Sequence, residues 1–143
     1  MKVLFDTSVL VPALVEQLSN HAVCFETLRT YTSGGNIGVC STHCLAECYS
    51  TLTALPLPRR VTPQEAFALI ERSVRGRLEV IELDTADYRA ALAKVVEGGL
   101  TSGIIYDALH ARVAEKAGCQ RIYTYNLNHF RPLCPANVLV SAP

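Results

Sequence analysis

Three acidic residues lie where an apolar segment gives way to a helical pattern, or on the helix that follows. They are Asp6 in V-L-F-D-T-S-V, Glu47 in C-L-A-E-C and Asp107 in I-I-Y-D-A-L-H. A fourth polar residue, Asn126, follows a short apolar stretch in I-Y-T-Y-N. In an open parallel sheet the carboxyl ends of the strands meet at one edge, so residues far apart in the chain can converge there.

Converging carboxylates repel one another, and the pKa of each rises unless a cation offsets the charge. Carboxylate oxygens are hard ligands that suit Mg²⁺ or Mn²⁺. An ion held by Asp6 and Asp107 would activate a water for attack on a phosphodiester and neutralise charge on the phosphoryl oxygens. Glu47, if it reaches the ion only through a water, could accept the proton of that water. The three acids therefore predict a metal-dependent phosphodiesterase.

Structural explanations compete for each of these residues. Asp6 alone can cap a helix that begins near Ser8. A buried carboxylate is costly unless it is paired or coordinated, and three acids at one predicted sheet edge are not explained by capping alone. His110 follows Asp107 by three positions and faces nearly the same side of the helix, so it either touches substrate or metal or serves as a hydrogen-bonded structural histidine. The role of His129 is left open between the same two alternatives.

The hydrophobic pattern predicts strands that alternate with helices. The predicted strands are 2–5, 37–40, 79–83, 121–124 and 138–140. The predicted helices are 9–18, 22–31, one from 41 or 42 that the prolines at 56 and 58 end, 63–75, one from 84 or 85 to 97, and 102–116. Such alternation implies an α/β protein with a mostly parallel sheet covered on both faces, in one domain over residues 1–143.

Local signals refine the helix ends. Pro12 is expected in the first turn of its helix, where proline is tolerated. Thr62 with Glu65 three positions later matches a capping box, and Gly118 is expected to close the helix that carries Asp107.

Composition limits the class of protein. With 143 residues and 50% hydrophobic residues the chain can bury a core, and a formal net charge of +0 excludes a broadly basic surface. The N-terminus lacks a signal-peptide layout and no apolar run is long enough for a membrane span, which predicts a cytoplasmic protein with no membrane contact. Six cysteines without a C-x-x-C pair indicate buried reduced thiols, although His43 beside Cys44 leaves a weaker metal alternative.

Five of the chain's arginines fall within residues 59–77. Three hypotheses remain open for this group: it grips phosphates beside the acidic metal site, it is an ordinary solvated helix face, or it forms a surface for a dimer or a protein partner. The five are Arg59, Arg60, Arg72, Arg75 and Arg77.

Four short motifs, in this order, resemble those of the PIN-domain ribonucleases, and most of all the toxins of bacterial VapBC toxin–antitoxin pairs. They are Asp6-Thr7-Ser8-Val9, Leu45-Ala46-Glu47, Tyr106-Asp107-Ala108 and Thr124-Tyr125-Asn126 with Phe130. The resemblance spans residues 2 to about 140. It implies a three-layer α/β/α sandwich, cleavage of single-stranded RNA with Mg²⁺ or Mn²⁺, a homodimer and a cognate antitoxin protein.

The resemblance also implies roles for individual residues. Asp6, Glu47 and Asp107 would be metal-binding acids, and Asn126 would fill a fourth catalytic position. Thr7, Ser8 and Thr124 would shape the pocket by hydrogen bonds. Many family members carry Asp where this chain has Asn126, so a single bound ion is expected rather than two.

Two rival classes remain, namely a phosphoaspartate enzyme or receiver domain and a binding module without catalysis. A receiver domain needs a further acidic pair near the N-terminus and a late lysine at a strand end, and a haloacid-dehalogenase-like phosphatase needs D-x-D where this chain has Asp6-Thr7-Ser8. A PIN-like module that binds RNA or protein without cutting stays open, given Asn126.

Overall fold

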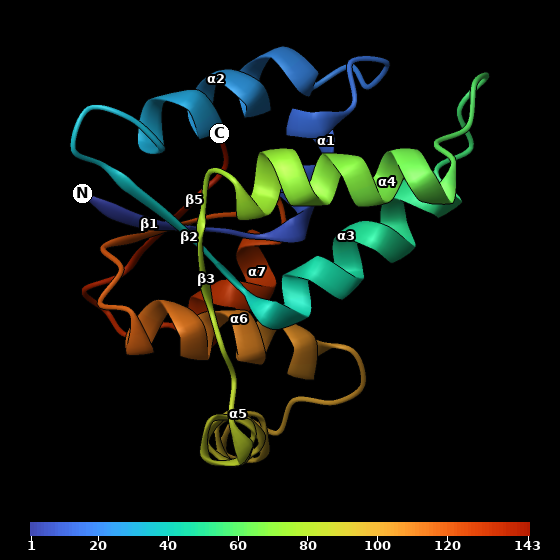
Figure 1. Cartoon of the computed structure of the whole chain (residues 1–143). Coiled ribbons are helices and arrows are strands. Elements are labelled where there is room, and N and C mark those ends of the chain that lie inside the picture. The colour runs from blue at the N-terminus through green and yellow to red at the C-terminus, as the bar shows by residue number, and fades with distance from the viewer.

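A five-stranded parallel sheet lies between two layers of helices in the computed structural model, which describes residues 1–143 (Figure 1). The strand order is β3-β2-β1-β4-β5, and each neighbouring pair is parallel. This confirms the predicted three-layer α/β/α architecture. The strands are β1 (Lys2–Phe5), β2 (Ile37–Ser41), β3 (Glu79–Ile81), β4 (Arg121–Tyr123) and β5 (Leu139–Ser141).

The helices divide between the two faces of the sheet. In Figure 1, α1, α2 and α4 lie on one side, with α3 packed against α1 and α4, and α5, α6 and α7 lie on the other. None of them has the length and apolar character needed to cross a membrane. The helices are α1 (Thr7–Leu14), α2 (His21–Tyr31), α3 (Thr42–Ala54), α4 (Pro63–Leu69), the π-helical η1 (Ile70–Arg75), α5 (Thr85–Glu97), α6 (Ile104–Lys116), α7 (Leu127–Phe130) and the 3-10 turn η2 (Arg131–Leu133).

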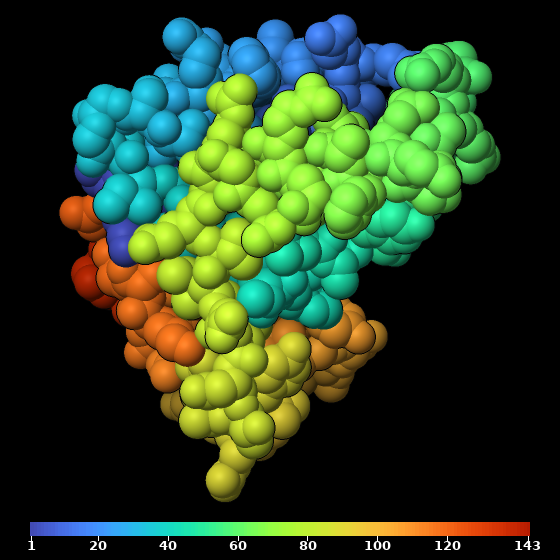
Figure 2. Space-filling model, in the orientation of Figure 1, coloured from blue at the N-terminus to red at the C-terminus, as the bar shows by residue number.

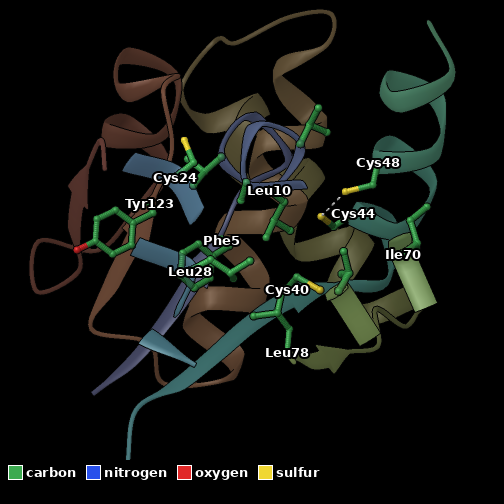
Figure 3. Packing of buried hydrophobic residues seen from close by; sticks show 14 of the residues in the cluster. Phe5, Leu10, Cys24, Leu28, Cys40, Cys44, Cys48, Ile70, Leu78 and Tyr123 are labelled. Atoms are coloured by element: carbon green, nitrogen blue, oxygen red, sulfur yellow. Dashed lines mark hydrogen bonds between the residues drawn. The ribbon is translucent and has the colours of Figure 1, made fainter. Parts of the chain in front are cut away.

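Each face of the sheet has its own apolar core, because successive side chains of a strand point to opposite faces. In β1, Val3 and Phe5 belong to the core beneath α1–α4, whereas Leu4 belongs to the core beneath α5–α7. The first core also holds four of the cysteines, which are free thiols (Figure 3). Figure 3 shows Cys44 and Cys48 turned toward each other, with their Sγ atoms 3.8 Å apart. As predicted, all six cysteines are free thiols; five are buried and Cys134 is half-buried.

The sheet reverses its winding between β1 and β4. After β1 the chain winds outward through β2 to β3, and it then crosses back to place β4 on the other side of β1. The segments that leave the carboxyl ends of β1 and β4 therefore turn to opposite faces, and such a reversal is where open α/β sheets form a crevice.

The first helix departs from the sequence prediction. It runs from Thr7 to Leu14 rather than 9–18, and Pro12 stands in its interior rather than its first turn. Proline has no N–H, so the carbonyl of Ser8 loses its helical partner. The helix ends soon afterwards, where Val15 is extended at φ −119° and ψ 102°.

Residues 63–75 are helical as predicted, but the second half, η1, is π-helical. Only half of the predicted capping box forms: the Glu65 N–H donates to Thr62 Oγ1 at 3.1 Å, and the Glu65 carboxylate instead accepts from the Thr62 hydroxyl and from Arg59. The complete capping box is at the start of α5, between Asp84 and Asp87.

The start of α6 also differs from the prediction. The helix begins at Ile104, since Ser102 has a left-handed φ of 59° and lies outside it. Its C-cap is Ala117, and Gly118 follows in the left-handed region at φ 69°, where glycine carries no steric cost.

A buried carboxylate joins α5 to α6. Asp87 accepts hydrogen bonds from Arg112 Nε at 3.0 Å and from Lys116 Nζ at 2.7 Å, and it is 2% exposed. The Lys116 hydrogen bond, together with the backbone N–H of Asp84 and the Arg112 guanidinium, holds the pKa of Asp87 well below its usual range. This network fixes the helix that carries Asp107.

The arginines of residues 59–77 do not form one patch. Arg59 and Arg60 lie on the α3–α4 loop, which projects from the molecule (Figures 1 and 2), and the other three lie at the opposite end of the α4–η1 helix. Arg59 pairs with Glu65 at 3.2 Å, and Arg75 pairs with Glu71 at 2.6 Å.

Candidate active site

A cleft of about 400 Å³ opens at the carboxyl end of β1. The four residues predicted as catalytic all line it, although they come from four separate segments of the chain. None of the five clustered arginines does. The lining residues are Asp6, Thr7, Ser8, Val11, Pro12, Leu18, Glu47, Thr51, Leu55, Asp107 and Asn126.

Asp6 follows β1 directly and extends the sheet by one bond, since its N–H donates to the Tyr123 carbonyl at 3.0 Å. It occupies the N-cap position of α1, yet its side chain makes no capping bond. Its Oδ2 instead accepts from Ser8 Oγ at 2.7 Å and from Thr124 Oγ1 at 2.8 Å. The carboxylate is therefore held for something other than helix capping.

The two hydroxyls that hold Asp6 also fix the segment after β4. Ser8 Oγ accepts the N–H of Tyr125 at 3.0 Å, and Thr124 Oγ1 accepts the N–H of Asn126 at 2.9 Å. Ser8 lines the cleft, whereas Thr124 is fully buried and contacts the site through Asp6 Oδ2, Ser8 Oγ and the backbone N–H of Asn126.

Glu47 lies in the second turn of α3, whose N-cap is Ser41: the Ser41 hydroxyl accepts the Cys44 N–H at 3.0 Å. The Oε1 of Glu47 is hydrogen-bonded to His110 Nε2 and accepts a longer bond from Thr7 Oγ1 at 3.4 Å. Both contacts use the same carboxylate oxygen.

His110 lies beneath the cleft rather than on its surface, a position that fits the structural alternative. It is 1% exposed, with Nδ1 2.9 Å from Ser41 Oγ and Nε2 3.9 Å from Asp6 Oδ1. Burial by itself lowers the pKa of His110, but the Glu47 hydrogen bond and nearby negative groups outweigh it and raise the pKa to about 9. A charged imidazolium between Asp6 and Glu47 offsets part of their repulsion.

Asp107 lies in the first turn of α6, and its Oδ2 is 3.0 Å from Nδ1 of His129. Burial and then the charge of Asp6 raise the pKa of Asp107. The ionised form is thus disfavoured in the protein without a bound cation.

Asn126 occupies the N-cap position of α7, but its side chain makes no capping bond. The side chain is exposed and lines the cleft beside the three acids. Its amide is therefore free for another partner.

The donor set fits a hard divalent cation. Hydrogen bonds within the chain engage one oxygen of each carboxylate, namely Oδ2 of Asp6, Oε1 of Glu47 and Oδ2 of Asp107. The other oxygens remain for an ion. No three ligand side chains meet closely enough to form a ready-made site, so ligation requires the carboxylates to draw together. The pKa of Asp107 is raised first by burial and then by the charge of Asp6, and a bound cation would offset both effects by favouring the ionised carboxylate.

Sequence reasoning missed two supports of the site. Ser41 was considered only as a helix cap, whereas it also bonds His110 from another element. The His43 ring stacks on Tyr106, with centroids 5.1 Å apart and planes at 5°. Neither contact has a local signal, because each joins residues that are more than 60 positions apart.

The parallel sheet, its winding reversal and the carboxylates at the crevice define an α/β/α protein with an acidic cleft. The family model described as PIN domain matches residues 3–132. The chain belongs to the PIN domain family.

Individual relatives agree with this assignment. The chain is 32% identical over 116 residues to Ribonuclease VapC40 of Mycobacterium tuberculosis, with 80% of each chain covered. Its fold matches the crystal structure of Mycobacterium tuberculosis VapC20, a sarcin-ricin loop cleaving toxin, with a TM-score of 0.69 and 19% identity over 89% of this chain and 92% of that one. It also matches VapBC2 from Rickettsia felis bound to a DNA fragment from its promoter, with a TM-score of 0.68 and 18% identity over 100% of both chains.

Proposed function

We propose that this protein is an endoribonuclease toxin that cuts single-stranded RNA with Mg²⁺ or Mn²⁺. The observation that carries the proposal is the convergence of Asp6, Glu47, Asp107 and Asn126 on one cleft in a PIN-domain chain. Its relative at 32% identity is named a ribonuclease, which supports the same activity.

Asp6, Asp107 and Glu47 would hold the ion, and Asn126 would bind it or an attached water. When bound, the ion supplies Lewis-acid polarisation of the phosphodiester and lowers the pKa of a water. Ser8 and Thr124 keep Asp6 oriented by their bonds to Oδ2. His110 holds Glu47 through Oε1. If Oε2 reaches the ion through a bound water rather than directly, it would accept the proton of that water.

The rival hypothesis is a PIN-like module that binds RNA or protein without cutting. The ribonuclease relatives and the three carboxylates do not favour it. The cleft carries acids and no lysine or arginine, so RNA phosphates would be repelled from it without a cation.

The proposal also includes two protein partners, an antitoxin and a second copy of this chain. A cognate antitoxin protein is supported by the VapBC2 structure, and a homodimer is typical of the family that the sequence resembles. We further propose that residues 1–143 act as one domain and that the protein works in the cytoplasm.

Cleavage of RNA by the purified protein tests the function. We expect wild-type protein to cut unstructured RNA in Mn²⁺ or Mg²⁺, to stop when EDTA removes the ion, and to spare duplex RNA. The Asp6→Asn variant should be inactive under all conditions, because it lacks a central carboxylate. Gel analysis of end-labelled RNAs measures this. Cleavage that persists in EDTA, or in Asp6→Asn, contradicts the proposal.

A second prediction concerns Asn126, the fourth residue of the proposed ion site. Asn126→Asp adds a formal charge beside the proposed ion, so it should tighten Mn²⁺ binding, by about 10-fold for 1.4 kcal/mol of added attraction. Calorimetric titration of Mn²⁺ into both proteins measures the change. The matched control is Asn137→Asp, which adds the same charge outside the cleft and should bind Mn²⁺ like the wild type. Unchanged or weaker binding by Asn126→Asp places Asn126 outside the coordination sphere.

A further inference from the structure

A row of four rings runs from the surface beside the acidic residues into the core. Tyr106 stacks on His43, the His43 ring lies 5.9 Å from the His110 ring, and His110 lies 6.5 Å from Phe130. The inner end is rigid, because His110 and Phe130 are both buried. Each ring is therefore supported by the one beneath it.

Tyr106 is the outer end of this row, and it is 49% exposed. One face of its ring is covered by His43, so the exposed part is turned away from His43. In the preceding turn Gly103 has no side chain, and even a Cβ there would lie 4.0 Å from Tyr106 Cδ2. The result is a flat aromatic surface that is fixed in orientation and open to solvent.

This surface adjoins the carboxylates but lies outside the cleft. Tyr106 precedes Asp107 in α6, and the supporting His43 has its Nε2 3.8 Å from Glu47 Oε1. Neither Tyr106 nor His43 lines the 400 Å³ cleft, whose lining includes Leu18 and Leu55. A strand that places a phosphodiester at the acids would thus pass the Tyr106 ring with an adjoining nucleotide.

We propose that the exposed face of Tyr106, backed by His43, is a stacking platform for an unpaired nucleobase next to the cleaved phosphodiester. The inference rests on the proposed ribonuclease function. Unpaired bases stack on exposed aromatic rings, and each such contact contributes about 1–3 kcal/mol. A base inside a duplex has both faces covered, so the platform selects single-stranded RNA. Tyr106 is a positioning residue, because it orients the strand and does not touch the reacting atoms.

Binding of a fluorescein-labelled 12-nucleotide oligoadenylate tests the platform. All variants carry Asp6→Asn, so that the RNA is not cut during the titration. We expect Tyr106→Ala to weaken binding by about 5- to 100-fold, and Tyr106→Phe to restore it. Tyr88→Ala is the matched control: Tyr88 is 42% exposed on α5, away from the cleft, and its removal should leave the affinity unchanged.

A spectroscopic signal separates stacking from a general structural role. The chain has no tryptophan, so Tyr106→Trp reports from that position alone, and its emission should be quenched when oligoadenylate binds. An abasic ribose-phosphate oligomer of equal length should bind Tyr106→Ala and its parent equally, and should not quench the tryptophan. Equal oligoadenylate binding by Tyr106→Ala and its parent, or unquenched emission, overturns the platform.

The cleavage assay keeps the two proposals apart. Wild-type protein that cuts RNA while Tyr106→Ala binds oligoadenylate normally overturns the platform alone. Wild-type protein that neither cuts nor binds any RNA overturns the ribonuclease function and the platform with it.

Discussion

Asp107→Asn should lower the rate of RNA cleavage by about 1,000-fold, the usual scale for losing a group that stabilises charge in a transition state. It should also weaken Mn²⁺ binding, because one of three carboxylates is lost. Without divalent ions the same change should raise the melting temperature by about 3 °C. The raised pKa of Asp107 shows why: its ionised form is disfavoured in the folded protein, so at neutral pH the charge destabilises the fold.

Cleavage kinetics, Mn²⁺ titration and thermal melts in EDTA measure the three effects. Glu97→Gln removes an exposed acid at the end of α5, outside the cleft, and should change none of them. Wild-type cleavage and Mn²⁺ affinity in Asp107→Asn would show that the metal site has been assigned to the wrong acids.

Asp87→Asn should destabilise the protein by about 3 kcal/mol, because it leaves Arg112 and Lys116 facing an amide at a buried position. The melting temperature should fall by about 10 °C. Thermal and urea unfolding measure the loss. Glu115→Gln, which removes only an exposed partner of Arg112, should cost less than about 1 kcal/mol.

The pH dependence of this effect has a definite sign. The folded-state pKa of Asp87 is depressed, so its stabilisation is present above the unfolded value of about 3.9 and is lost as pH falls toward the folded pKa. The difference in unfolding free energy between wild type and Asp87→Asn should therefore shrink as pH falls from about 5 to 2. A difference that stays constant over this range would mean that Asp87 does not titrate with folding.

The strands and the acidic positions could be predicted because their signals are local. Apolar runs such as Lys2–Phe5 mark buried parallel strands, and the winding rules bring the ends of β1 and β4 together. Convergence of Asp6, Glu47, Asp107 and Asn126 on one cleft follows from that topology.

The missed features depend on contacts between distant elements or on small shifts in one helix. The hydrophobic pattern is compatible with Pro12 in the first turn of α1 or in its interior. The observed start of the helix at Thr7 places Pro12 in the interior. The π-helical form of η1 has no sequence signature. The side of α6 that His110 faces could be predicted, but its partners could not, because Ser41 and Glu47 reach it from the β2–α3 segment.

The sheet order has a consequence for a chain that is still being synthesised. β4, which pairs with β1 beside Asp6, is formed by residues 121–123, and Asp107 and Asn126 also come from the last third of the sequence. A nascent chain of about a hundred residues has Asp6 and Glu47, but it lacks His110 and Thr124, the side chains that hold them. On the proposed function, the ribosome-bound protein would be unable to cut RNA, including the message that encodes it, until nearly all of its sequence had emerged.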